Sequence, residues 1–228
     1  MARFGFVGST GARVLRMSGT PAAPRWRGRL HLAAFVIAVP AGIGLAWHQH
    51  GIAVVVYVVS LTCLFGVSAS YHLLPMSPGR RRFARQVDHA MIYVYIAAAY
   101  GPFCLDVMGG RAGRMVLSVV WLGAAVGIST KVVAFRGSRF VSAALYLVLG
   151  WIAVFALPEA AHRMGTVDLA LLLFMGLLYT AGAVVLARHA PDPVPDVFGY
   201  HEVWHAAVVL ACACYFVVVW TMPALGPR

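Results

Sequence analysis

Residues 200–220 read YHEVWHAAVVLACACYFVVVW, an almost uninterrupted apolar stretch that opens with two histidines. A helix of about 20 apolar residues crosses the hydrocarbon core of a bilayer, which is about 30 Å thick. His201 and His205 are four residues apart, so they share one face of such a helix. Because ionisable groups within a membrane are costly and usually face a protein interior, this stretch predicts both a membrane helix and a functional site.

The composition extends the membrane prediction to the whole chain. Of the 228 residues, 61% are hydrophobic and 11% are charged. Soluble domains average about 45–50% apolar and about 25% charged residues. A soluble fold of this length cannot bury that much apolar surface, so the composition predicts an all-α, polytopic membrane protein.

Seven stretches are long and apolar enough to cross a bilayer, and short loops marked by proline, glycine or charged residues separate them. They are residues 30–48, 52–74, 87–106, 115–134, 140–157, 167–187 and 199–221. We therefore predict a seven-transmembrane helix bundle over residues 30–221. A basic tail at 1–29, which lacks the continuous apolar region of a signal peptide, precedes it, and a short tail at 222–228 follows.

The net charge of +11 is interpreted as basic loops that set the orientation in the membrane. It is not taken to indicate a nucleic-acid partner. With the N-terminus inside, fourteen Lys and Arg residues lie on the inner side and four on the outer side. Positive residues favour the cytoplasmic side, so we expect a multi-pass protein of the cell membrane with a cytoplasmic N-terminus and an external C-terminus. The expected partner is membrane lipid, and the pattern indicates no particular oligomeric state.

On that topology, polar residues of three spans lie at one depth near the inner face. His72 is close to the inner end of the second span, and Ser68 is one turn deeper. Asp88 begins the third span, and His201 and His205 occupy the first two turns of the seventh. We expect these five side chains to meet.

The residue types at this depth predict a zinc centre. Three imidazoles, from His72, His201 and His205, suit zinc and leave a fourth position for water, as in catalytic sites. Because zinc makes a bound water acidic near neutral pH, Asp88 either accepts a proton from that water or orients an imidazole. Ser68 either donates to a developing oxyanion or bonds its own helix. The alternative for each histidine is a buried neutral ring bonded to the backbone.

Other polar residues near the spans have simpler interpretations. Glu202 and His89 are rotated by about 100° from the predicted site, which favours a supporting or headgroup-facing role. The four cysteines lie in apolar segments and indicate packing rather than disulfides. The remaining histidines are expected at wet span ends or in loops: His31, His48, His50, His162 and His189.

The chain resembles the hemolysin III family, within the progestin and adiponectin receptor superfamily. Three blocks carry the resemblance: Ser68-x-x-x-His72, RQVDHAMIYVYIAAAYGPF at 85–103, and FGYHEVWHAAVV at 198–209. It covers nearly all of residues 25–221. The resemblance implies a seven-helix, N-inside protein with zinc near the cytoplasmic face.

Carried over residue by residue, the resemblance makes the three histidines above the ligands, with Asp88 near the zinc-bound water and Ser68 beside it. Two departures concern other positions. Many relatives carry two more hydroxyls where this chain reads AAAYGPF at 97–103, and many carry an acidic residue and a Thr-His pair where it reads Leu30-His31-Leu32.

Three functions follow as hypotheses. The superfamily is similar to membrane hydrolases that cleave amide bonds of ceramide-type lipids, which implies a zinc-dependent hydrolase of lipid amides or esters. The first alternative is a pore-forming, haemolytic membrane protein in which the metal is structural. The second is a non-enzymatic regulator of membrane-lipid homeostasis.

Overall fold

The computed structural model describes residues 24–133 and 139–222. Most of the predicted N-terminal tail, and residues 223–228 of the predicted C-terminal tail, lie outside the described residues. The described residues are helical apart from turns, short connections and one isolated β-bridge, which confirms the all-α prediction. The elements are α1 (Arg29–Gln49), α2 (Ile52–Leu73), α3 (Pro78–Pro102), η1 (Phe103–Met108), α4 (Gly110–Val133), α5 (Arg139–Trp151), η2 (Ile152–Ala156), α6 (Leu157–Arg163), α7 (Thr166–Arg188) and α8 (Tyr200–Thr221).

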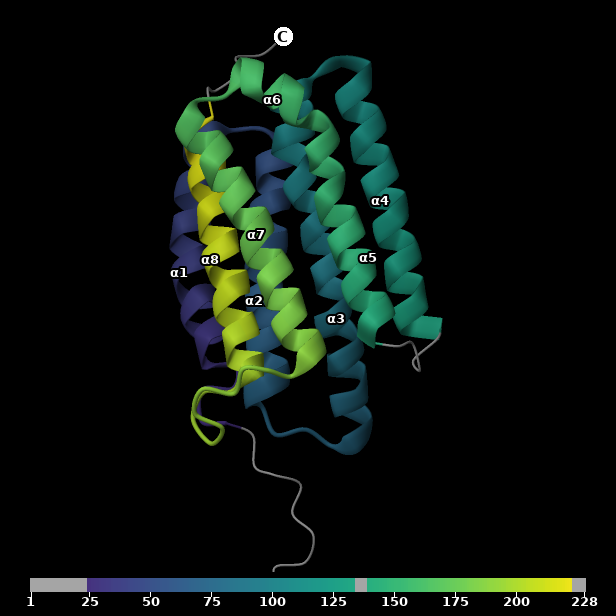
Figure 1. Cartoon of the computed structure of the whole chain (residues 1–228), viewed down its shortest axis with the longest axis vertical. Coiled ribbons are helices and arrows are strands. Elements are labelled where there is room, and N and C mark those ends of the chain that lie inside the picture. Colours follow the sequence, from purple (N-terminus) through teal and green to yellow (C-terminus); the bar gives the residue numbers. More distant parts are fainter. Residues whose placement is uncertain (1–23, 134–138, 223–228) are drawn as a thin grey trace, which may run out of the picture.

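The long helices lie side by side along the long axis of the molecule (Figure 1). The α2–α3 and α7–α8 connections lie at one end of this bundle. Helix α6 and the end of α8 lie at the opposite end. The last turn of α2 and the first turns of α3 and α8 are therefore at the same end.

Within the described residues, six helices are long and apolar enough to cross a membrane. They are α1, α2, α3 continued through η1, α4, α7 and α8, and they correspond to six of the predicted spans. The fifth predicted span, 140–157, contains a shorter apolar helix, Ala144–Ala156, made of α5 and η2. The polytopic prediction is thus confirmed, while the count of seven spans and the orientation stay predictions.

Helix α3 and the segment after the fifth predicted span differ from the predictions for local reasons. Helix α3 begins at Pro78, nine residues before the predicted span, because proline is well suited to the first turn, where its missing N–H is no loss. At its other end α3 reaches Pro102, and a π-helical segment, Phe103–Met108, follows. Residues 158–163, expected as a loop, belong to the short helix α6 (Leu157–Arg163), again with a proline in the first turn.

The bundle is apolar outside and partly polar inside. Large apolar side chains such as Ile37, Leu122 and Phe155 are exposed on its surface. The buried core contains Tyr57 and Tyr93 beside the aliphatic residues. This distribution fits a helix bundle surrounded by lipid, in which polar groups must find their partners within the protein.

The close packing of α7 against α8 depends on Gly182. A Cβ added there would lie 2.7 Å from the Trp204 ring and 3.1 Å from the Cβ of Ala207. Small residues let membrane helices approach in this way. Since Trp204 immediately precedes His205, this contact also sets the position of the first turns of α8.

We expect Gly182→Ala to destabilise the protein by about 1–3 kcal/mol, because the added methyl overpacks the α7–α8 contact. The matched control is Gly176→Ala on the same helix, where the new Cβ would meet Trp151 at an ordinary 3.7 Å. Thermal unfolding of both variants in detergent checks the prediction. Equal melting temperatures for the two variants would contradict it.

Candidate metal centre

Three histidines meet at the end of the bundle where α2 ends and α8 begins. One ring nitrogen from each of His72, His201 and His205 lies within 4.8 Å of the others. The Nε2 atoms of His72 and His201 are 3.4 Å apart. The structure therefore brings together the three residues that the sequence predicted as ligands.

Local helix geometry explains how each ring reaches this point. Helix α8 begins at Tyr200, where the Glu202 side chain accepts the Gly199 N–H in a capping interaction, so His201 and His205 lie in its first two turns. Their ring centroids are 4.6 Å apart. His72 lies in the last turn of α2, with its ring centroid 5.1 Å from each of the other two.

One pair of nitrogens in the cluster has the spacing of two ligands of a zinc ion. Zinc–nitrogen distances of about 2.0–2.1 Å in a tetrahedron separate two ligand nitrogens by about 3.3–3.4 Å. The 3.4 Å between the Nε2 atoms of His72 and His201 matches that separation. Among the described residues none of the three rings bonds to a backbone group, and the buried Nδ1 of His205 has no hydrogen-bond partner. The rings are thus not held by the backbone contacts of ordinary buried histidines.

Asp88 and Ser68 lie beside this cluster but outside the three-nitrogen group. Asp88 comes from α3 and Ser68 from α2, and the two side chains interact with each other. Both line the same cavity as His201 and His205. The residues predicted to act with the metal therefore share a cavity with two of its predicted ligands.

That cavity has a volume of about 770 Å³ and runs between α3, α5, α7 and α8. Small-molecule sites typically enclose about 300–1,000 Å³. Its wall is mainly apolar, with side chains such as Ile92, Leu172 and Val208, and it extends as far as Phe103 and Leu157. A polar end joined to a long apolar space suits an amphiphilic molecule.

His31 is a residue of this site that sequence reasoning missed. It was expected at a wet span end, but it is only 4% exposed, because the first turn of α1 packs against both α2 and α8. Its ring stacks on that of His205, with centroids 3.9 Å apart and planes at 9°. Neither of its ring nitrogens has a hydrogen-bond partner within residues 24–133 and 139–222.

A sequence signal for the burial of His31 does exist. His31 lies on one face of α1 with the other buried residues of that helix: Ala34, Ala38, Gly42 and Leu45. This stripe of small residues is typical of a helix that packs closely against its neighbours.

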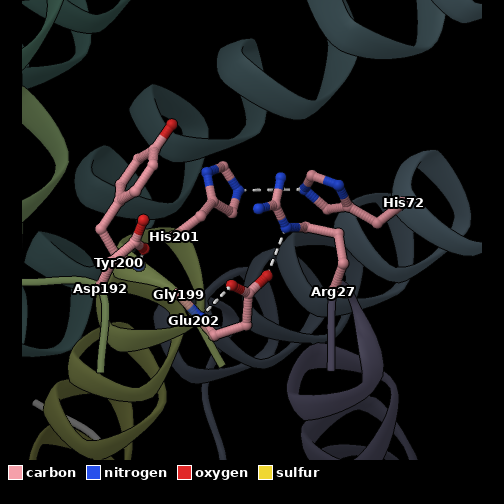
Figure 2. A network of polar contacts seen from close by, with 7 residues as sticks. All are labelled: Arg27, His72, Asp192, Gly199, Tyr200, His201 and Glu202. Atoms are coloured by element: carbon pink, nitrogen blue, oxygen red, sulfur yellow. Dashed lines mark hydrogen bonds and ion pairs between the residues drawn. The ribbon is translucent and has the colours of Figure 1, made fainter. Parts of the chain in front are cut away.

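Glu202 is also buried, at 0% exposure, which excludes the headgroup-facing role. Its carboxylate accepts a hydrogen bond from the Arg27 Nε and another, of 2.9 Å, from the Gly199 N–H. Figure 2 shows the Arg27 guanidinium next to the two imidazoles of His72 and His201. Arg27 falls within the range predicted as a tail, where sequence periodicity assigns no structure.

Known proteins are similar to this chain over most of its length. The family described as "Haemolysin-III related" matches residues 21–216. Hemolysin-3 from Bacillus cereus is 30% identical over 198 residues, covering 83% of this chain and 86% of the relative. The Hemolysin-3 homolog of Bacillus subtilis (strain 168) is 28% identical over 185 residues, covering 81% and 83% of the two chains.

A human protein is similar over the same region. The Monocyte to macrophage differentiation factor of Homo sapiens is 27% identical over 201 residues, covering 82% of this chain and 79% of the relative. The resemblance predicted from the sequence blocks is confirmed, and the chain belongs to the haemolysin-III-related family of membrane proteins.

Proposed function

We propose that the protein is a zinc-dependent intramembrane hydrolase that cleaves an amide or ester bond of a membrane lipid. The observation that carries this proposal is the convergence of three imidazole nitrogens within 4.8 Å at the polar end of a long apolar cavity. Lipid hydrolysis needs an activated water, a proton acceptor and an apolar space for the chain. The residues around this cavity are suited to all three.

The proposed topology has seven spans and a cytoplasmic N-terminus. The span added to the six long helices is the fifth in chain order, the pair α5 and η2, which runs alongside α4 and α7 and leads to α6 at the far end of the bundle (Figure 1). The excess of Lys and Arg on the side of the α2–α3 and α7–α8 connections supports a cytoplasmic position for that end. The histidine cluster then lies near the cytoplasmic face.

Each proposed site residue has one role. His72, His201 and His205 hold the zinc ion, which supplies activated water and polarises a carbonyl group when bound. Asp88 accepts the proton of the attacking water, since a carboxylate in the cavity is positioned to act as a general base. Ser68, which lies against Asp88, donates a hydrogen bond to the carbonyl oxygen of the substrate as negative charge develops there.

The cavity supports a substrate with a long chain. Its lining along α3 and the start of η1 extends from Asp88 to Phe103, which corresponds to about 22 Å of helix at about 1.5 Å per residue. That length suits an extended acyl chain whose carbonyl end lies at the histidines. The apolar wall favours the chain, and the polar end favours the amide or ester group.

Haemolytic pore formation is a second candidate, favoured by the names of the Bacillus relatives, Hemolysin-3 and its homolog. A pore requires polar residues along a full crossing of the bilayer. In this chain the ionisable side chains of the cavity gather towards the cluster end, which favours the hydrolase. In a pore the metal would have a structural role, as it would in a non-enzymatic regulator of membrane-lipid homeostasis.

Purified protein should contain about one zinc ion per chain. His72→Ala, His201→Ala and His205→Ala should each lose most of it, because a three-nitrogen site loses a ligand. Elemental analysis after chelator-free purification measures the content. His162→Ala, at an exposed position on α6, is the matched control and should keep its zinc. Wild type with far less than one zinc per chain would sink the proposed centre.

Replacement of Asp88 by Asn should lower turnover by about 100-fold or more while leaving zinc content intact, because only the proton acceptor is lost. The assay is release of a labelled fatty acid from N-acyl amides and acyl esters in liposomes, with dye leakage recorded on the same vesicles. Asp106→Asn, a carboxylate on η1, is the control. Leakage that is unchanged in Asp88→Asn, without any lipid cleavage, would support the pore instead.

Single cysteines in a background free of the native ones should report seven spans. We expect Ser77→Cys and Asp192→Cys to react with an impermeant reagent only after the cells are permeabilised. Arg111→Cys and Met164→Cys should react in intact cells. If α5 does not cross the membrane, the labelling of Met164→Cys and Asp192→Cys reverses.

A further inference from the structure

The residues just before α1 are docked on the connection that leads into α8. The Arg25 N–H donates to the Asp196 carbonyl and the Trp26 N–H to the Val197 carbonyl, both at 3.1 Å. These are backbone hydrogen bonds between segments about 170 residues apart in the sequence. These bonds therefore tie the turn at 24–28 to the connection that leads into α8.

The same turn lies against the end of α2. Gly28 has a φ of +78°, and a Cβ added to it would lie 2.6 Å from the Cβ of His72. Only glycine combines this left-handed backbone with so close an approach. One short turn thus contacts both helix ends that carry the clustered histidines.

An ion pair joins the turn to α8 directly beside the cluster. The Arg27 Nε donates to one carboxylate oxygen of Glu202, and the other oxygen accepts the Gly199 N–H at the helix start (Figure 2). The Glu202 side chain is 0% exposed and that of Arg27 23%. Because Glu202 is the residue next to His201, a shift of this carboxylate moves the first turn of α8.

We propose that Arg27 and Glu202 are positioning residues of the metal centre. Their ion pair holds the start of α8 against the turn that covers His72, and so keeps His201 facing His72 at the spacing that a metal ion needs. This inference rests on the proposed zinc site but on no step of lipid hydrolysis. It makes the segment before α1 a structural part of the centre.

Tertiary contacts must set the His72–His201 distance, because the two residues are 129 positions apart. His201 and His205 keep their mutual spacing through α8 alone, since they are one turn apart. His72 belongs to another helix, and its distance from them depends on how the ends of α2 and α8 are held. The turn at 24–28 bridges these two ends.

A purely electrostatic role for Arg27 makes a different prediction. Its guanidinium is close enough to interact electrostatically with both His72 and His201. A cation next to a site for a divalent ion disfavours metal binding. If charge alone mattered, Arg27→Gln would tighten zinc binding; if the ion pair positions α8, the same change weakens it.

The test is the zinc affinity of the full-length protein in detergent, measured by competition with a chelator. Arg27→Gln and Glu202→Gln should each weaken binding by about 10- to 100-fold, as loss of groups that orient metal ligands usually does. The double variant should be no weaker than the weaker single one, because both changes remove one interaction. Arg27→Lys, which keeps the charge pair, should recover part of the loss.

Cobalt(II) gives a second readout that does not depend on activity. The visible absorption of cobalt reports coordination geometry, and it should change in Arg27→Gln in the direction seen in His72→Ala. Arg25→Gln, within the turn, and Arg29→Gln, just after it, remove the same charge from exposed side chains and leave the backbone contacts in place, so both should leave affinity and spectrum unchanged.

Zinc binding as tight as wild type, or tighter, in Arg27→Gln overturns the positioning role. If Arg27→Gln also cleaves lipid, the hydrolase proposal stands although the positioning role does not. A different outcome overturns the hydrolase alone: the wild-type protein cleaves no lipid, while Arg27→Gln weakens zinc binding and Arg29→Gln does not. That outcome supports the positioning role.

Discussion

The structure depends on one constraint: polar side chains within the apolar part of a membrane must find their hydrogen-bonding and ionic partners among themselves. Water is scarce there, so an isolated imidazole or carboxylate is costly, and the groups gather where helix ends meet. His72, His201 and His205 form the centre of that gathering, with Asp88 beside them. The first turn of α1 covers the cluster through the stacking of His31 on His205.

The same constraint divides the cavity into two parts. Among the described residues that line it, the Asp, Lys, Arg and His side chains gather at one end, near the histidines, and apolar side chains of α3, α5 and α7, together with several tyrosines, line most of the rest. A molecule that fills this space therefore has a polar group at a fixed depth and an apolar chain along the helices. In the proposed hydrolase, this division would position the scissile group along the bilayer normal before any particular residue contacts it.

Sequence reasoning succeeded where simple geometry connects spacing to position. A separation of four residues places His201 and His205 on one face of a helix, and the order of the spans places Ser68, His72 and Asp88 at one depth. The burial of His31 was missed because it depends on how α1 packs against α2 and α8. Arg27 was missed for a related reason: it lies in a turn without periodicity, and its partner is 175 residues away.

The residues that sequence reasoning missed are those that fix the helices relative to one another. Lipid tails are as apolar as leucine, so burial of apolar surface does little to hold one membrane helix at a given height against another. Close contacts such as that of Gly182 with Trp204, and polar contacts such as that of Arg27 with Glu202, are specific enough to do so. A metal tolerates errors of only a few tenths of an ångström in ligand position. The geometry of the proposed centre therefore depends on a few such contacts, beyond the apolar pattern that makes the chain a membrane protein.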